Sequence, residues 1–183
     1  MTILHIDSSI NGENSASRAI SRSIVGQLRA TDPVSELVTR DLVSEPLPHL
    51  TLDTFADSTV LDEFLAADTI VIGAPMYNFT LPTQLKAWLD RILVAGKTFR
   101  YTESGPEGLA TGKRVIVALA RGGFYDAGSP ASALEHLESY LRGVFNFIGI
   151  EPEFVAADGL AIGPEQREGS IRQALGQTVR LAA

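Results

Sequence analysis

The chain has 183 residues, of which 45% are hydrophobic and 20% are charged, and this mix suits one globular domain with a sizeable core. Its formal net charge of −7 argues against binding to nucleic acid or to an anionic membrane surface, because it has no surplus of Lys and Arg to replace phosphate counterions. The lack of cysteine excludes a disulfide framework, a thiolate nucleophile and a cysteine metal site.

Targeting and membrane signals are also missing from the sequence. The first residues, Met1–Asp7, lack the basic region and long apolar run of a signal peptide. No apolar stretch approaches the roughly 20 residues that a membrane helix needs. The histidines, at positions 5, 49 and 136, are not spaced like metal ligands. We therefore expect a cytoplasmic protein with no metal site and no membrane partner.

Short apolar runs alternate along the chain with longer segments of helical period. The expected strands are, in chain order, residues 3–6, 34–39, 69–74, 114–120 and 153–157. The expected helices are residues 17–30, 53–67, 82–95 and 131–148, with a last helix that begins at residue 164. Residues 99–112 form a glycine-containing excursion. Such strict alternation predicts an α/β fold, in which helices cover both faces of a parallel sheet.

Three loops with unusual composition follow the first, third and fourth expected strands. Ligands of such sheets bind beyond the carboxyl ends of the strands, so we expect the function to lie in these loops. The first, residues 7–18, holds four serines at a strand-to-helix junction. Hydroxyls and the unpaired N–H groups of a helix start can together hold a phosphate. The alternative is that Ser15 or Ser17 merely caps the helix.

The other two loops suit a flat ligand. Residues 74–82 contain two aromatic rings, a methionine and Asn78, although local packing and an asparagine turn would give the same composition. Residues 120–125 contain paired glycines, which either let a ligand approach backbone amides or form a flexible turn. The G-x-x-x-x-G-K-[ST], G-x-G-x-x-G and G-x-S-x-G motifs are all missing, which weakens P-loop, Rossmann and esterase interpretations.

Several segments, in the same order along nearly the whole chain, carry a family resemblance. They are Asp7-Ser8-Ser9 with Ser15-Ala16-Ser17, Ala74–Phe79 with Thr83–Lys86, Thr98–Thr102 with Gly105–Leu109, and Arg121-Gly122-Gly123. Together they resemble the FMN-dependent NADH-azoreductase family, relatives of the NAD(P)H quinone reductases. This resemblance implies a flavodoxin-like three-layer sandwich with sheet order 2-1-3-4-5, in which residues 1–183 form a single FMN-binding domain.

The resemblance also implies a function. FMN would bind without a covalent bond, with its phosphate at Ser9, Ser15 and Ser17. The cofactor contacts that it implies are Ser9, Ser15, Ala16, Ser17, Pro75, Met76, Tyr77, Asn78, Phe79, Ala120, Arg121, Gly122 and Gly123. The substrate contacts are Tyr101, which would reach the partner's flavin in a homodimer, Phe124 and Tyr125. NADH or NADPH would supply the electrons for two-electron reduction of a quinone or cleavage of an aromatic azo bond, and the flavin, rather than a catalytic side chain, would carry the chemistry.

The sequence departs from the family at three places. The family commonly has Ser where Ala120 stands and His where Tyr125 stands, and residues 41–52 are shorter here than the usual excursion, so the substrate preference is open. Three alternative functions also stay open: a flavodoxin-type electron carrier without substrate turnover, a phosphate-ester hydrolase that uses the serine loop, and a redox-sensing partner protein.

Overall fold

A five-stranded parallel sheet forms the centre of the computed structural model, which describes residues 1–181. Its strands are β1 (Thr2–Asp7), β2 (Glu36–Asp41), β3 (Thr69–Pro75), β6 (Arg114–Ala120) and β7 (Glu153–Ala157). They lie in the order β2-β1-β3-β6-β7, and each neighbouring pair is parallel. This arrangement confirms the predicted order 2-1-3-4-5. The predicted domain of residues 1–183 includes residues 182 and 183, which lie outside the described part of the chain.

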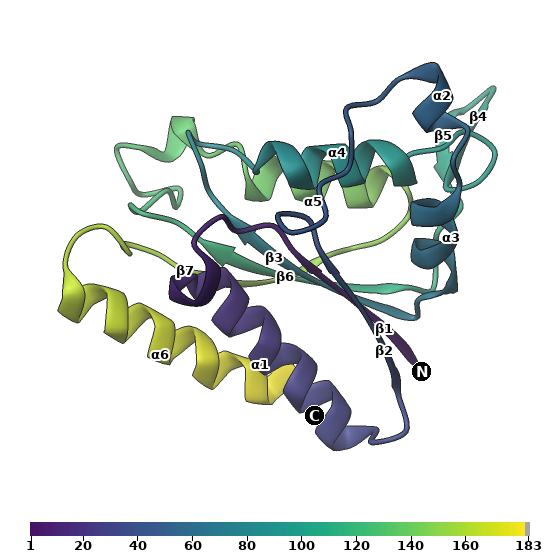
Figure 1. Cartoon of the computed structure of the whole chain (residues 1–183). Coiled ribbons are helices and arrows are strands. Elements are labelled where there is room, and N and C mark those ends of the chain that lie inside the picture. The colour runs from purple at the N-terminus through teal and green to yellow at the C-terminus, as the bar shows by residue number, and fades with distance from the viewer. Residues whose placement is uncertain (182–183) are drawn as a thin grey trace.

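Helices cover both faces of the sheet, as Figure 1 shows. One face carries α1 (Ala16–Thr31) and α6 (Pro164–Leu181), which pack against each other. The other face carries α3 (Thr59–Ala66), α4 (Thr83–Ile92) and α5 (Glu138–Phe147). The result is the predicted three-layer sandwich.

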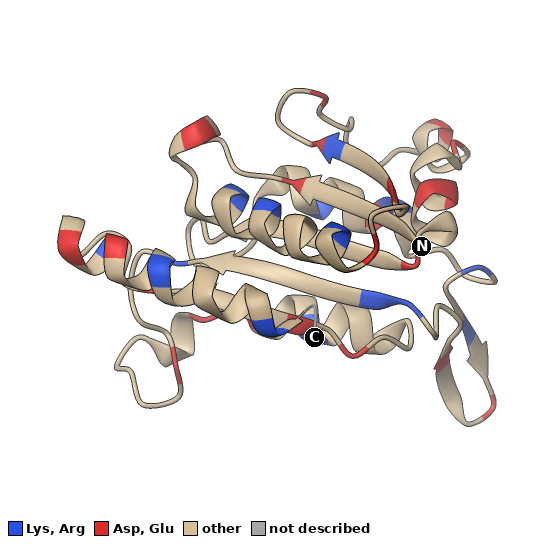
Figure 2. Ribbon diagram, turned by 90° about the horizontal axis from the view of Figure 1, so that it is seen from below, with Lys and Arg blue, Asp and Glu red and all other residues tan. Residues whose placement is uncertain are grey.

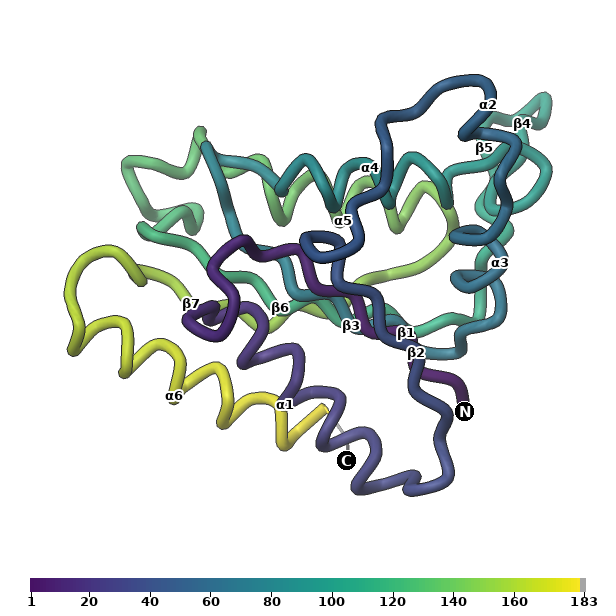
Figure 3. The backbone as a smooth tube through the Cα atoms, in the orientation of Figure 1, coloured from purple at the N-terminus to yellow at the C-terminus, as the bar shows by residue number. Residues whose placement is uncertain are grey.

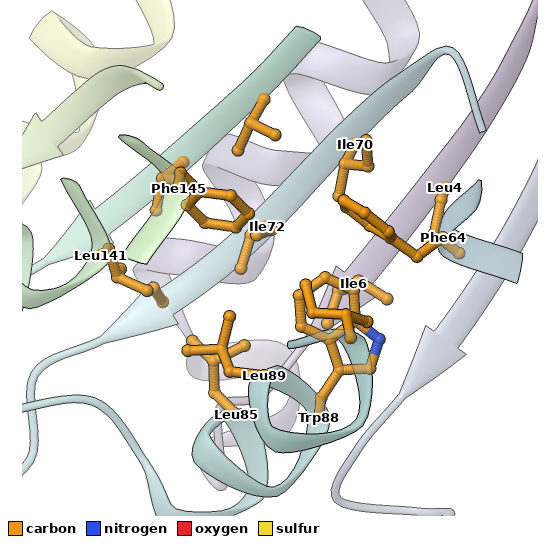
Figure 4. Packing of buried hydrophobic residues seen from close by; sticks show 14 of the residues in the cluster. Leu4, Ile6, Phe64, Ile70, Ile72, Leu85, Trp88, Leu89, Leu141 and Phe145 are labelled. Atoms are coloured by element: carbon orange, nitrogen blue, oxygen red, sulfur yellow. The ribbon is translucent and has the colours of Figure 1, made fainter. Parts of the chain in front are cut away.

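The larger part of the core lies between the sheet and the α3-α4-α5 layer (Figure 4). There, Ile70 and Ile72 of β3 lie in one buried cluster with Trp88, Phe64 and Phe145 from the three helices. The ring of Phe64 meets that of Trp88 edge-on at 6.1 Å. Val71, between them on the strand, belongs to a second cluster under α1 and α6. Burial on both faces explains why this strand is apolar throughout.

The predicted helix over residues 53–67 is wrong as one element, because the structure divides it in two. A short helix, α2 (Leu52–Phe55), ends before α3 begins at Thr59. The carboxylate of Asp57 accepts hydrogen bonds from both the backbone N–H (3.0 Å) and the hydroxyl (2.7 Å) of Thr59. These local bonds compete with a continuous helical ladder and start the second helix afresh.

The predicted helix over residues 131–148 also begins later than expected. A 3-10 turn, η2 (Ser132–Leu134), comes first, and Leu134, which was expected to face inward, is 43% exposed. The carboxylate of Glu135 then accepts hydrogen bonds from the backbone N–H groups of residues 137, 138 and 139, at 3.0, 2.7 and 2.9 Å. Because this side chain satisfies the first free donors of α5, the helix starts at Glu138.

The glycine-containing excursion contains an antiparallel hairpin of β4 (Phe99–Thr102) and β5 (Gly105–Gly108). The ring of Phe99 packs on that of Phe147, with 4.7 Å between centroids, and the N–H of Ala110 donates to the carbonyl of Ile148 (3.0 Å). Since α5 ends at Phe147 just before β7 begins, the hairpin lies at the amino-terminal edge of the sheet. In Figure 3 it is far from the loop between β1 and α1.

Acidic and basic residues are interspersed along the chain, and none of the described helices or strands consists mainly of Lys and Arg (Figure 2). Within residues 1–181, no helix has both the length and the apolar content needed to cross a membrane.

Candidate functional site

The loops after β1, β3 and β6 meet at the carboxyl edge of the sheet (Figures 1 and 3). The phenol oxygen of Tyr77 lies 3.2 Å from the hydroxyl of Ser9 and accepts a hydrogen bond from the N–H of Ile10 at the same distance. The N–H of Met76 donates to the carbonyl of Ala120 (2.8 Å). These bonds join the three loops that the sequence analysis singled out.

A fourth loop, between β7 and α6, closes the arrangement into a ring. The N–H of Ala161 donates to the carbonyl of Gly122 (3.0 Å), which ties this loop to the one after β6. From the second turn of α6, the guanidinium of Arg167 donates to the carbonyl of Asn14 (2.6 Å) in the first loop. Four segments that are distant in sequence therefore surround one space.

That space is a cavity of about 230 Å³. Eight of the predicted cofactor contacts line it: Ser9, Ser15, Ala16, Pro75, Met76, Tyr77, Ala120 and Gly122. The lining also includes five residues that the sequence analysis missed: Asn11, Asn14, Leu160, Ala161 and Arg167. The loop after the fifth strand ends at the same edge of a parallel sheet as the others, and this was the signal that could have found Leu160 and Ala161.

At one end of the cavity, the start of α1 presents unsatisfied hydrogen-bond donors. Ser15 is the N-cap, and its hydroxyl accepts a hydrogen bond from the N–H of Arg18 (3.2 Å) and lies 3.1 Å from the hydroxyl of Ser17. Within residues 1–181, the N–H groups of Ala16 and Ser17 have no acceptor. Free N–H groups at the positive end of a helix favour an anion. Ser15 caps the helix, as the alternative expectation had it, and also borders the cavity, whereas Ser17 is buried.

The first loop is held in place by a buried ion-pair network. The guanidinium of Arg18 donates to the carbonyl of Ser9 (2.9 Å), to both carboxylate oxygens of Asp41 (2.8 Å each) and to Asp7 (3.4 Å). The hydrogen bonds to Asp41 raise the pKa of Arg18 above its ordinary value, despite the opposing effect of burial. Asp7, which also accepts a hydrogen bond from Ser21 (3.1 Å), is 3% exposed. It supports the loop and does not line the cavity.

The second loop contains a tight turn with an unusual backbone. Tyr77 and Thr80 exchange two backbone hydrogen bonds, of 2.9 and 3.1 Å, around the two central residues. Those residues, Asn78 and Phe79, have φ angles of 48° and 73°, in the left-handed region that non-glycine residues avoid. A bulky residue there costs on the order of 1–3 kcal/mol, and such strain gathers at functional sites. Asn78 and Phe79 stand beside the cavity, not in its lining.

The side chain of Arg121 anchors the third loop from behind. Its guanidinium donates to Asp158 at 2.6 and 2.9 Å and to Glu138 at 3.3 Å, and the side chain is 7% exposed. Burial disfavours its charge, but the hydrogen bonds to Asp158 and the nearby glutamates outweigh this and raise the pKa of Arg121. Its backbone N–H is bonded to the carbonyl of Ala157 (2.9 Å). Arg121 therefore contributes to the site through the position of its loop.

The two glycines that follow Arg121 present free backbone N–H groups, and aromatic side chains pack close to this part of the chain. Within residues 1–181, the N–H groups of Gly122 and Gly123 have no acceptor. The ring of Tyr125 lies over Gly123, and that of Phe124 lies over Gly159, where any Cβ would be 2.8 Å from the ring. The ring of Tyr125 also meets that of Phe79 edge-on at 6.4 Å. Two predicted substrate contacts thus stand beside the cavity.

Tyr101, the third predicted substrate contact, is not part of this group. It lies in the hairpin at the opposite edge of the sheet and is 75% exposed. Within one chain it cannot reach the cavity. Any role for Tyr101 in substrate binding therefore requires a second chain, as the sequence analysis assumed.

The comparisons with known proteins agree with this geometry. The family model described as a flavodoxin-like fold matches residues 1–181. A relative from Bradyrhizobium diazoefficiens, named FMN-dependent NADH:quinone oxidoreductase 2, is 54% identical over 201 residues, an alignment that covers 100% of both chains. The chain belongs to the FMN-dependent NADH:quinone oxidoreductase family. The resemblance stated from the sequence is thereby confirmed.

Solved structures extend this family likeness to azoreductases. An azoreductase from Bacillus anthracis superimposes with a TM-score of 0.91 at 27% identity, covering 100% of this chain and 98% of the other. An FMN-dependent NADH-azoreductase from the same species, solved in complex with FMN, gives a TM-score of 0.84 at 25% identity and covers 100% of both chains. The quinone oxidoreductase family and these azoreductases therefore share one flavodoxin-like architecture.

Proposed function

We propose that the ring of four loops binds FMN and that the chain acts as an FMN-dependent NADH:quinone oxidoreductase, as its family does. One observation carries this proposal. Two sets of free backbone donors lie at this cavity, at Ala16 with Ser17 next to it in the chain, and at Gly122 with Gly123 next to it. Of these four residues, Ala16 and Gly122 line the cavity. The first set, with the hydroxyls of the serine loop, suits a phosphate. The second suits the acceptor atoms along the edge of a flavin ring.

Bound FMN supplies the redox chemistry, which is hydride acceptance from NADH and two-electron delivery to the quinone. The chain's own residues would bind the cofactor and the substrates and hold them in position. The strained turn at Asn78 and Phe79 fixes the loop that we propose to wrap the flavin ring, and Arg121 fixes the loop that presents Gly122. The exposed rings of Phe79 and Phe124, 43% and 47% accessible, offer flat apolar surface for the nicotinamide and the acceptor. Holding reactants in the right geometry is the protein's main contribution to such chemistry.

The direct test is the absorbance spectrum of the purified protein, recorded before and after anaerobic addition of NADH. We expect a flavin spectrum that bleaches with NADH, followed by steady NADH oxidation when a menadione-type quinone is added. Bleaching without turnover would favour the electron-carrier alternative. A protein that cannot bind FMN and cannot oxidise NADH would refute the proposal.

A single substitution tests where the phosphate binds. Ser9→Asp would place a carboxylate against the phosphate at the start of α1, so FMN affinity should fall at least about tenfold at low salt. The control is Thr31→Asp, which adds the same charge at the far end of α1, about 24 Å away for a 16-residue helix. Equilibrium dialysis measures both affinities. Equal affinities in the two variants would remove Ser9 from the site.

The structure speaks against the hydrolase alternative. A serine nucleophile needs an adjacent general base within hydrogen-bond reach. Within residues 1–181, the hydroxyl of Ser9 contacts Tyr77 and the N–H of Asn11, and that of Ser15 contacts Ser17 and the N–H of Arg18. None of these partners is a histidine or a carboxylate. We propose azo compounds as further acceptors, because the flavin chemistry is the same and the structural neighbours are named azoreductases.

We also propose that the chain works as a homodimer of single domains in the cytoplasm. An apolar groove at α4 and α5 is lined by Leu93, Ser139, Tyr140, Gly143, Val144 and Phe147. The exposed Tyr101, whose ring meets that of Phe99 at 5.6 Å, extends from the neighbouring hairpin. We propose that a second copy docks on this surface and that Tyr101 of each copy reaches the cavity of the other. Sedimentation equilibrium should give a dimer, and Val144→Asp should give a monomer.

A further inference from the structure

We propose that Arg167 recognises the phosphate of the cofactor and makes the site select FMN over riboflavin, its phosphate-free form. This inference rests on the proposed function, since it names a further residue at the same cavity. Sequence reasoning had assigned the phosphate to neutral hydroxyls and backbone amides alone. The structure adds a guanidinium from α6, a helix that lies more than 140 residues further along the chain.

The position of Arg167 is the first argument. It lines the cavity together with Ser9, Ser15 and Ala16, the residues at the phosphate end. Its guanidinium reaches across to the first loop and donates to the carbonyl of Asn14 (2.6 Å), the residue directly before the N-cap of α1. This single bond uses one of the five N–H groups of an arginine. The bond fixes the side chain beside the helix start and leaves donors for an anion.

The charge of Arg167 is the second argument. It is the only charged side chain among the described residues that line the cavity. The other charges around the first loop are already paired, Arg18 with Asp7 and Asp41, and Arg22 with Glu13. Within residues 1–181, Arg167 has no carboxylate oxygen within 4.0 Å, although acidic residues alternate with basic ones along α6 (Figure 2). Its charge is therefore available to a ligand.

Electrostatics explains why such a cation is needed. The whole chain carries a net charge of −7, which opposes the approach of a dianionic phosphate. Hydroxyls and backbone amides contribute hydrogen bonds without formal charge. Hydrogen bonds between ionised partners are roughly twice as strong as neutral ones, and an arginine can present two at once to a phosphate. Riboflavin offers no charge to Arg167, so its binding does not depend on this residue.

The test compares Arg167→Gln with Arg172→Gln. Both changes remove one positive charge from α6, but Arg172 is exposed and does not line the cavity. The full chain is stripped of flavin, checked for folding by circular dichroism, and titrated with FMN or riboflavin by flavin fluorescence. Titrations at about 20 mM and about 500 mM NaCl bracket Debye lengths of roughly 20 Å and 4 Å.

Arg167→Gln should raise the Kd for FMN about tenfold at low salt and leave the Kd for riboflavin within about twofold. Arg167→Lys, which keeps the charge, should recover most of the FMN affinity and its salt dependence. Arg172→Gln should leave both flavins unaffected. If the wild-type chain binds FMN and Arg167→Gln weakens both flavins equally or neither, the inference is overturned while the proposed function stands. If the wild-type chain binds no FMN, both are overturned.

Discussion

Gly73 shows at the scale of a single residue how the carboxyl edge of the sheet is packed. A Cβ at this position of β3 would be 2.6 Å from the carboxylate of Asp7 and 3.2 Å from the hydroxyl of Ser21. Asp7 cannot retreat, because Arg18 and Ser21 hold it in a buried site. The hydroxyl of Ser8 also donates to the carbonyl of Gly73 (2.7 Å). The network that supports the serine loop therefore depends on the absence of a side chain here.

We expect Gly73→Ala to lower the free energy of unfolding by about 1–3 kcal/mol, the usual cost of overpacking a buried site. Gly26→Ala is the matched control, since Gly26 lies on α1 with nothing within 4 Å of an added Cβ. That change should raise stability by roughly 0.5–1 kcal/mol, because alanine suits a helix better than glycine. Urea unfolding measures both. A Gly73→Ala protein as stable as wild type would mean that Asp7 can move.

At the scale of elements, the sequence predicted where the five strands of the central sheet lie more accurately than where the helices begin. The central strands β1, β3 and β6 follow buried apolar runs, and the alternation of strand and helix gave the parallel sheet. The edge strand β2, which is only partly buried, begins two residues later than predicted. Helix starts were missed where one carboxylate decides them, as Asp57 does for α3 and Glu135 does for α5. The sequence analysis missed Arg167 because no motif around this residue indicates that its side chain reaches the loop between β1 and α1. Only the packing of α6 on α1 brings it there.

The hairpin of β4 and β5 gives a prediction at this scale. Gly108 is so close to the turn after α5 that a Cβ would lie 2.2 Å from backbone atoms of Ile148 and Gly149. Gly108→Ala should therefore push the hairpin away, break the bond from the N–H of Ala110 to Ile148, and speed hydrogen exchange at Ala110.

The control for the hairpin is Gly169→Ala on α6, where an added Cβ meets nothing within 4 Å. Exchange at Ala110, followed by NMR, should be the same in this variant as in wild type. Slow exchange at Ala110 in the Gly108→Ala protein would show that the hairpin and the turn after α5 can separate slightly without losing their bond.

At the scale of the whole molecule, the pair of Arg18 and Asp41 links α1 to the end of β2 and makes stability depend on pH. Hydrogen bonds from Arg18 hold the pKa of Asp41 below its ordinary value in the folded chain. The pair therefore stabilises the fold fully above the unfolded pKa of about 3.9. This contribution is lost as the pH falls through the lower, folded value.

Asp41→Asn should lower the free energy of unfolding at neutral pH by about 1.5–3 kcal/mol, the range for hydrogen bonds to charged groups. It should also reduce the loss of stability below about pH 4. Urea midpoints measured from about pH 3 to about pH 7 test both expectations. Glu107→Gln, which breaks the exposed pair with Arg100, should leave the midpoints nearly unchanged. Identical pH profiles for wild type and Asp41→Asn would contradict this account.

The ring of four loops also sets an order of events during folding. Its first member follows β1, near the start of the chain, and its last is closed by Arg167, close to the end. The cavity is therefore complete only after α6 has docked on α1.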